Sequence, residues 1–293
     1  MTIPRDLPAA TSGWRDLIDL ALAEDVGNGD ITTLSTVAED ATATGTLLAK
    51  EAGVLSGVDV AEAVFAIVDP AITFKAVKRN GDPIEVGDTI ARLAGSARSL
   101  LTAERTALNI MQRLSGVATA TARYVDATKG TGATIVDTRK TTPGMRMLEK
   151  RAVLHGGGGN HRFGLADGVL IKDNHLAAIG GDHPVRDAVR SARKLAPHTM
   201  KIEVEVTTLA ELDKALEAGA DIVLLDNMDT TTMTEAARRR DVAAPGTLLE
   251  ASGGITLERI AVIAATGIDL ISVGALTHSS KALDISLEFA LSR

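Results

Sequence analysis

A basic stretch from Asp137 to His175 is the densest group of side chains in this sequence that could do chemistry. It carries seven lysines and arginines against four acids, in a chain whose formal net charge is −7, and it holds three of the six histidines. A local excess of positive charge on an acidic protein attracts small anions. Arginine offers a planar fork for carboxylate or phosphate, and lysine offers a compact point charge. The stretch therefore predicts an anion-binding site, with a solvated charged loop as the alternative.

The elements that must position these side chains are apolar strands. From Thr131 onward, six short runs rich in Val, Ile and Leu alternate with mostly helical segments, a pattern typical of a parallel sheet with both faces covered. Six such units predict a closed or nearly closed α/β barrel, and a doubly wound open sheet is the alternative. The predicted strands are 133–138, 168–174, 201–206, 221–227, 247–252 and 270–275, and the predicted helices are 184–195, 208–218, 230–240 and 256–266.

Two acids stand at the ends of consecutive predicted strands. A parallel barrel binds its ligands at the carboxyl ends of its strands, so Glu205 and Asp226 should lie side by side at one rim. Paired carboxylates beside cations suggest oxygen ligation of Mg²⁺ near a phosphate. Salt bridges to Lys140 or Lys172 are the alternative.

Glycines follow the last two predicted strands. Ser252, Gly253 and Gly254 precede a predicted helix, and Gly274 follows the last strand. Backbone N–H groups in such positions cradle phosphate in many phosphate-binding barrels. We therefore expect a phosphate site here, although a glycine pair taken alone is usually only a tight turn.

The region before the barrel has a different texture. Short strands and one helix between residues 41 and 95 predict a small α+β module. A helix is expected over 99–114, ending at Ser115-Gly116, and a second helix is expected over 117–129. Arg105 lies on the first of these helices, where a surface ion pair with a neighbouring acid is the simplest interpretation.

The change of texture also predicts the domain organisation. We expect an N-terminal α/β sandwich domain over residues 1–116 and an α/β barrel domain over 117–276. The C-terminal tail, 277–293, is expected to pack back on the first domain.

Composition excludes several classes of function. Aromatic residues make up only 2% of the chain and the pI is near 5.4, which argues against stacking of single-stranded nucleic acid and against general duplex binding. The chain has no cysteine, so neither a disulfide framework nor a thiolate metal site is available. No apolar run approaches the length of a membrane span, about 18 residues, and no signal peptide is evident. We expect a cytoplasmic protein.

Long motifs in this chain resemble those of the quinolinate phosphoribosyltransferase family. The resemblance covers nearly the whole chain, in order, and is most specific between Asp137 and His175. The matching segments are E-D-V-G-N-G-D-I-T-T, T-A-E-R-T-A-L-N-I-M-Q-R-L-S-G-V-A-T, D-T-R-K-T-T-P-G-M-R, E-K-R-A-V-L-H-G-G-G-G-N-H-R-F-G-L-A-D-G-V-L-I-K-D-N-H, I-E-V-E-V, I-V-L-L-D-N and S-G-G-I.

The resemblance implies an activity and an architecture. Quinolinate and phosphoribosyl pyrophosphate would give nicotinate mononucleotide, carbon dioxide and pyrophosphate, with Mg²⁺, in the de novo synthesis of NAD. The implied fold is an N-terminal α/β sandwich followed by an incomplete α/β barrel. The implied assembly is a homodimer whose active sites borrow residues from the partner, with a hexamer as an alternative.

The resemblance also implies the roles of individual residues. Cations would bind the two carboxylates of quinolinate, acids would hold the metal, and the glycine turns would cradle the 5′-phosphate. Quinolinate would bind to Arg105, Arg139, His161, Arg162 and Lys172, phosphoribosyl pyrophosphate to Lys140, magnesium to Glu205 and Asp226, and the phosphate to Ser252, Gly253, Gly254 and Gly274. Thr138 is a further expected substrate-binding residue. The residues expected to be catalytic are Lys140, Lys172, Glu205 and Asp226.

Three other functions stay open at this point. A related pyrophosphorylase of the same fold could act on another anionic substrate. A Schiff-base aldolase could use Lys172 as its nucleophile, although the surrounding charge disfavours a neutral amine. A non-enzymatic anion sensor would bind quinolinate without releasing pyrophosphate.

Overall fold

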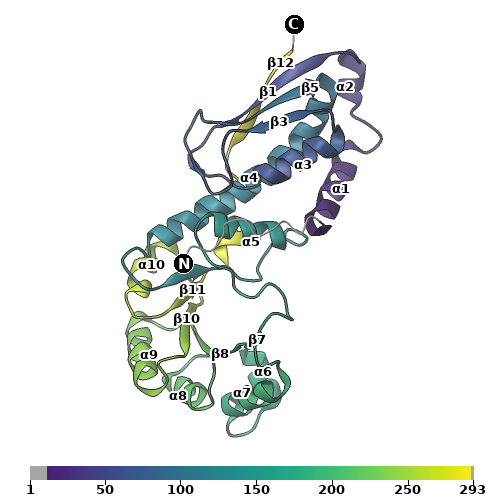
Figure 1. Ribbon diagram of the computed structural model, residues 1–293. Helices are drawn as coiled ribbons and strands as arrows, with labels where there is room; N and C mark the ends of the chain where they lie inside the picture. The colour runs from purple at the N-terminus through teal and green to yellow at the C-terminus, as the bar shows by residue number, and fades with distance from the viewer. Residues whose placement is uncertain (1–11, 292–293) are drawn as a thin grey trace. The chain divides into compact units, whose positions relative to one another are not determined.

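The computed structural model describes residues 12–291, which form two compact units (Figure 1). The first unit runs to Ala122 and adds Thr141–Gly157 and the segment from Ala275 onward; the second comprises Arg123–Lys140 and Gly158–Gly274. The units therefore interleave along the sequence, and the domain cut expected after residue 116 stays a prediction. Within residues 12–291, no helix combines the length and apolar character needed to cross a bilayer.

The first unit is built on an antiparallel sheet. Its strand order is β12-β1-β5-β3, so the last strand of the chain pairs with the first. Along β1 (Thr42–Ala49) buried side chains recur at every second residue, as expected of a strand with one face on a core. Its other elements are α1 (Ser12–Val26), α2 (Ile31–Thr36), β2 (Gly53–Val54), α3 (Val58–Val68), β3 (Thr73–Ala76), β4 (Pro83–Ile84), β5 (Thr89–Ser96), α5 (Arg146–His155), α11 (Ala275–His278) and β12 (Ile285–Leu291).

One long helix replaces the two that the sequence predicted. α4 runs unbroken from Ala97 to Asp126, so the predicted break at Ser115-Gly116 is wrong. A helix tolerates an interior glycine at a cost of about 1 kcal/mol, and here the glycine has a packing reason. A Cβ built on Gly116 would stand 1.9 Å from the backbone oxygen of Lys281. The glycine marks a close backbone approach, not a helix end.

The second unit is an incomplete parallel α/β barrel, which confirms the predicted fold class. Its sheet has the order β6-β11-β10-β9-β8-β7, every neighbouring pair is parallel, and no pairing between β6 and β7 is seen in the described residues. The strands are β6 (Thr134–Val136), β7 (Val169–Ile171), β8 (Ile202–Val206), β9 (Ile222–Asp226), β10 (Leu248–Ser252) and β11 (Leu270–Ser272), and the helices are α6 (Asp173–Ile179), α7 (Pro184–Leu195), α8 (Leu209–Glu217), α9 (Thr230–Ala243) and α10 (Leu257–Ala264).

Local sequence signals explain most of these boundaries. α8 begins with a capping box, because Thr208 accepts from the backbone of Glu211 while the Glu211 carboxylate accepts from the cap backbone. All six predicted strands are present. β7 is shorter than predicted because α6, which the sequence did not predict, begins at Asp173.

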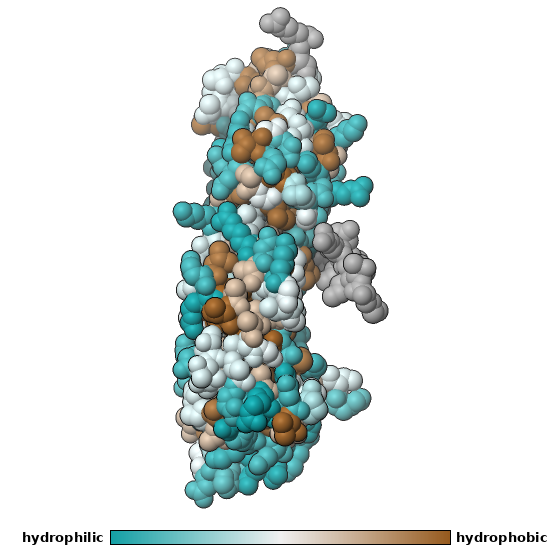
Figure 2. All heavy atoms as spheres, turned by 90° about the vertical axis from the view of Figure 1, so that its left-hand side faces the viewer, coloured by the Kyte–Doolittle hydropathy of each residue, from teal (hydrophilic) through white to brown (hydrophobic). Residues whose placement is uncertain are grey.

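Apolar residues on the surface are scattered. On the face shown in Figure 2, hydrophobic residues form small separate groups among hydrophilic ones. A mixed surface of this kind is ordinary for a folded protein and marks no docking site by itself.

Candidate active site

The carboxyl ends of the neighbouring strands β7, β8 and β9 carry the charged residues that the sequence predicted at one rim. Lys172, just after β7, places its Nζ 2.7 Å from Oε2 of Glu205 on β8. Asp226 ends the neighbouring strand β9, and Asn227 donates from Nδ2 to its Oδ2 at 2.8 Å. The ion pair that we considered as an alternative to metal ligation therefore exists for Glu205.

The glycine turn after β10 packs against this rim. Gly253 has φ +87°, and a Cβ built on it would lie 2.3 Å from Oδ1 of Asn227. Asn227 itself has φ +54° and donates its backbone N–H to the carbonyl of Ser252 at 3.0 Å. The close packing of these two successive strand ends therefore leaves no room for a side chain at position 253.

The segment Gly159–Gly168 extends from one edge of the open barrel to the other. Gly159 bonds to β6 through its N–H, which reaches Ile135 O at 2.8 Å, and Gly168 leads directly into β7. The carboxylate of Asp137, fully buried, accepts from the His161 backbone at 2.9 Å and from Asn160 Nδ2 at 2.7 Å. Residues 159–161 are therefore fastened to the end of β6.

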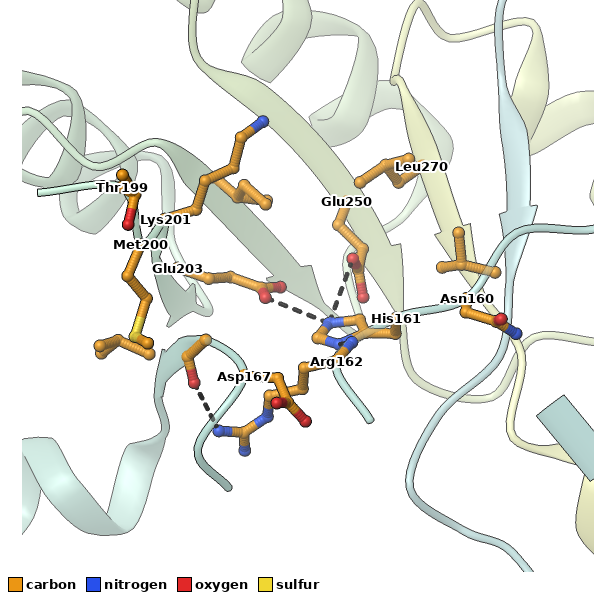
Figure 3. A pocket seen from close by; sticks show the side chains of 14 residues that line it. Asn160, His161, Arg162, Asp167, Thr199, Met200, Lys201, Glu203, Glu250 and Leu270 are labelled. Atoms are coloured by element: carbon orange, nitrogen blue, oxygen red, sulfur yellow. Dashed lines mark hydrogen bonds and ion pairs between the residues drawn. The ribbon is translucent and has the colours of Figure 1, made fainter. Parts of the chain in front are cut away.

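A cavity of about 330 Å³ lies beside this segment (Figure 3). His161 and Arg162 line it, and much of the remaining wall comes from residues at the beginnings of strands, including Val169, Ile222 and Leu270. The cavity therefore lies toward the amino ends of the strands, whereas the sequence predicted ligands at the carboxyl ends. Of the predicted site residues, only His161 and Arg162 line it.

Arg162 is a partly buried cation with unused hydrogen-bonding capacity. Its Nη1 donates to Gly168 O at 3.0 Å, while its buried Nε makes no hydrogen bond. Burial lowers the pKa of Arg162, and the nearby charge of Arg139 lowers it further, against the opposing effect of Glu203 and Asp167. Two neighbouring guanidinium groups favour an anion.

Two buried carboxylates that the sequence analysis did not single out face His161. Its Nε2 lies 3.1 Å from Oε2 of Glu203 and 3.6 Å from Oε2 of Glu250 (Figure 3). Burial, together with the charge of Glu203, raises the pKa of Glu250 to about 7. An available signal was the presence of glutamates inside otherwise apolar strands. Among residues 12–291, His161, Glu203 and Glu250 form the group whose ligand atoms lie close enough together to bind one metal ion. Glu205 and Asp226 are not part of this group.

The other predicted residues are spread over both units. The Thr138 hydroxyl accepts from the backbone N–H of Lys140 at 3.0 Å, which shapes the turn after β6. Arg105 belongs to the first unit, its side chain is 59% exposed, and it lies 3.8 Å from Glu104, the ion pair that the sequence suggested. Gly274 lies two residues after the last residue of β11, Ser272.

The parallel barrel, its charged rim and its clustered guanidinium groups define a barrel enzyme of an anion-binding class. Family models described as the N-terminal and C-terminal domains of quinolinate phosphoribosyl transferase match residues 30–115 and 117–288. The chain belongs to this family.

Known relatives match nearly end to end. A nicotinate-nucleotide pyrophosphorylase [carboxylating] of Mycobacterium leprae is 47% identical, with 94% of this chain and 96% of that protein covered. The solved structure of NadC from Streptococcus pyogenes is 41% identical with a TM-score of 0.91, covering 98% and 99% of the two chains. The nicotinate-nucleotide pyrophosphorylase of Francisella tularensis is 40% identical with a TM-score of 0.88, covering 99% and 98%.

Proposed function

We propose that this protein transfers the phosphoribosyl group of phosphoribosyl pyrophosphate to quinolinate, giving nicotinate mononucleotide, carbon dioxide and pyrophosphate. Membership of the family and the names of its relatives support this activity. The observation that carries it is that Arg139 lies near enough to the partly buried Arg162 for its charge to lower the pKa of Arg162. Two adjacent carboxylates on one ring are the ligand that such a pair fits best.

The remaining cations have places in the same scheme. Arg139, Arg162, His161 and Lys172 bind quinolinate, and Lys140, with Thr138 beside it, faces phosphoribosyl pyrophosphate. Ser252, Gly253, Gly254 and Gly274 cradle the 5′-phosphate with backbone N–H groups.

The chemistry needs no protein nucleophile. The pyridine nitrogen forms a bond to the anomeric carbon as the bond from that carbon to pyrophosphate breaks, and cations stabilise the departing charge. The alkylated ring nitrogen is then positive, so the ring accepts the electron pair of the breaking C–C bond. The 2-carboxylate leaves as carbon dioxide, and a proton from solvent replaces it.

The acids at the rim fit a magnesium ion by their donor type. Glu205 and Asp226 offer carboxylate oxygens from neighbouring strands, which suits a hard cation that keeps several waters. When bound, the ion would neutralise charge on pyrophosphate. The test is a magnesium titration of Glu205→Ala and Asp226→Ala. Unchanged magnesium dependence in both variants would remove the assignment.

The ion pair of Lys172 argues against the aldolase alternative. An ammonium held 2.7 Å from Glu205 is a poor nucleophile. Borohydride trapping with a carbonyl substrate should therefore leave the protein unmodified.

Arg105 is proposed to act in the site of a neighbouring subunit of a homodimer. If it does, Arg105→Ala and Lys172→Ala homodimers should both be nearly inactive, and mixing them should restore activity. Random exchange makes half of the dimers mixed, each with one intact site of two, so activity should return to roughly a quarter of wild type. No recovery under conditions shown to exchange subunits would contradict the shared site. The cytoplasmic location and the hexamer alternative stay predictions.

The direct test is incubation with quinolinate, phosphoribosyl pyrophosphate and Mg²⁺, followed by detection of nicotinate mononucleotide and pyrophosphate. Nicotinate in place of quinolinate should give little product. Binding of quinolinate without pyrophosphate release would instead favour an anion sensor.

A further inference from the structure

The interior of the barrel contains acid groups that the proposed chemistry does not use. Glu203 is 4% exposed and Glu250 is 1% exposed, and three of their four carboxylate oxygens, Oε1 of Glu203 and both of Glu250, make no hydrogen bond with protein. An unsatisfied buried carboxylate is costly. Two buried acids with so few hydrogen bonds in the middle of a sheet therefore suggest a functional role for these residues.

The position of the His161 ring gives that reason. Its Nδ1 accepts the backbone N–H of Arg162 at 2.7 Å, so this nitrogen carries no proton. Nε2 is therefore the protonated nitrogen, and it points at Glu203 Oε2 3.1 Å away. The ring links the buried carboxylates on one side to the peptide of Arg162 on the other, and Figure 3 shows its contacts with the two carboxylates.

We propose that Glu203 and Glu250 are positioning residues, which hold the ring of His161 in one orientation and one tautomer, and through it the peptide and side chain of Arg162. The inference rests on the proposed function, since Arg162 is there assigned to a carboxylate of quinolinate. Glu203 provides the acceptor for Nε2–H. Glu250, whose Oε2 lies 3.6 Å from the same nitrogen, acts on the ring through its charge, and its carboxyl carries a proton at the lower end of the physiological pH range.

The charges around Glu250 make its proton relevant to anion binding. Burial and the charge of Glu203 raise its pKa to about 7, while the charges of His161 and Lys172 act in the opposite direction. Ionisation above that pH adds a negative charge to the cluster that holds the Arg162 backbone. Quinolinate is a dianion in this range, so the added charge should weaken its binding.

Quinolinate binding by calorimetry at pH 6.5 and 8.0 tests the role of Glu250. Wild type should lose affinity by roughly tenfold between these pH values, as expected for about 1.4 kcal/mol of added repulsion. Glu250→Gln, which imitates the protonated carboxyl, should differ by less than about twofold between the two. A Glu250→Gln protein with the full pH dependence of wild type would overturn the proposal.

Glu203→Gln tests the contact to the ring. It should raise the KM for quinolinate by roughly tenfold, the effect of losing a charged acceptor, and leave the KM for phosphoribosyl pyrophosphate within about twofold. A purely structural role would move both constants or neither, and either result counts against the proposal. Ile263→Val is the control for general destabilisation, and Asp213→Asn, which removes a surface partner of Arg239, is the control for loss of a carboxylate. Both should behave like wild type.

The tautomer can be read without any substrate. In the full-length protein labelled with ¹⁵N-histidine and assigned by a His161→Asn variant, the ring should show protonated Nε2 and unprotonated Nδ1. The opposite tautomer would overturn the proposal. Purified protein that contains about one zinc ion per chain, lost in Glu250→Gln, would also overturn it, since the cluster would then be a metal site.

If wild type makes no nicotinate mononucleotide, the proposed function fails together with the role of Glu203 and Glu250. If wild type is active and the two variants match it, the positioning role alone fails.

Discussion

Glu203 and Glu205 lie two residues apart on the same strand, on the same side of the sheet, and meet opposite environments. Glu205, near the carboxyl end, pairs with a full positive charge 2.7 Å away on Lys172. Glu203, one pleat deeper, meets an imidazole and a second buried carboxyl. At the rim a charge is balanced by another charge that solvent also reaches. In the interior, the carboxylate of Glu203 is stabilised by the proton on His161 and by protonation of the neighbouring Glu250, because few full charges are available there.

The largest effect should come from breaking the balance at the rim. Lys172→Ala removes a proposed substrate cation and leaves Glu205 without its partner. We expect kcat/KM to fall by about 10²–10³, the range for loss of one preorganised electrostatic group. Lys129→Ala, which removes only a surface pair with Asp126, is the control and should be neutral. Activity of Lys172→Ala within about fivefold of wild type would contradict the rim assignment.

The buried carboxyl of Glu250 should make the free energy of unfolding depend on pH. The folded pKa of Glu250 is raised to about 7 from 4.5, so its stabilising contribution is complete below pH 4.5 and is lost as pH rises through 7. The difference corresponds to about 3 kcal/mol, at 1.36 kcal/mol per pKa unit. Urea unfolding of wild type and Glu250→Gln should therefore show wild type losing stability relative to the variant between pH 5 and pH 8. Parallel stability curves would mean that Glu250 is not protonated in the folded protein.

Arg139→Lys tests whether geometry matters as much as charge beside Arg162. A single ammonium cannot reproduce a bidentate fork to a carboxylate. We expect a loss of about 1.5–3 kcal/mol in quinolinate binding, the range for hydrogen bonds to charged groups. Calorimetry giving an affinity within about twofold of wild type would contradict the role of Arg139.

The smallest expected effect concerns the glycine turn at the rim. Gly253→Ala would place a methyl group 2.3 Å from Asn227 Oδ1 at φ +87°. We expect a loss of about 1–3 kcal/mol in stability, with a raised KM for phosphoribosyl pyrophosphate, because the backbone must leave its present conformation. Gly246→Ala has open space and no positive φ, and should be close to neutral. Equal behaviour of the two variants would show that the turn is not constrained.

The sequence by itself determined the architecture of the barrel and the family. Apolar runs of strand length, alternating with helices, are local features, and each predicted strand appears close to its expected place. The long motif between Asp137 and His175 identified the family because so many residue types recur in a fixed order. The break predicted at Gly116 was wrong because the contact that requires a glycine comes from Lys281, far along the chain.

Only the tertiary structure decided what the buried acids do. Glu203 and Glu250 lie on strands separated by β9, and His161 lies on a segment that joins the two edges of the open sheet. In the sequence each is a single glutamate among apolar residues, and the two glutamates of I-E-V-E-V look equivalent. Their difference arises from depth along the strand and from which side chain lies opposite, and both are set by the pairing of strands and the path of the connecting segment. Local residue patterns carry no information about that pairing, so the charge and proton arrangement of the interior followed from the fold alone.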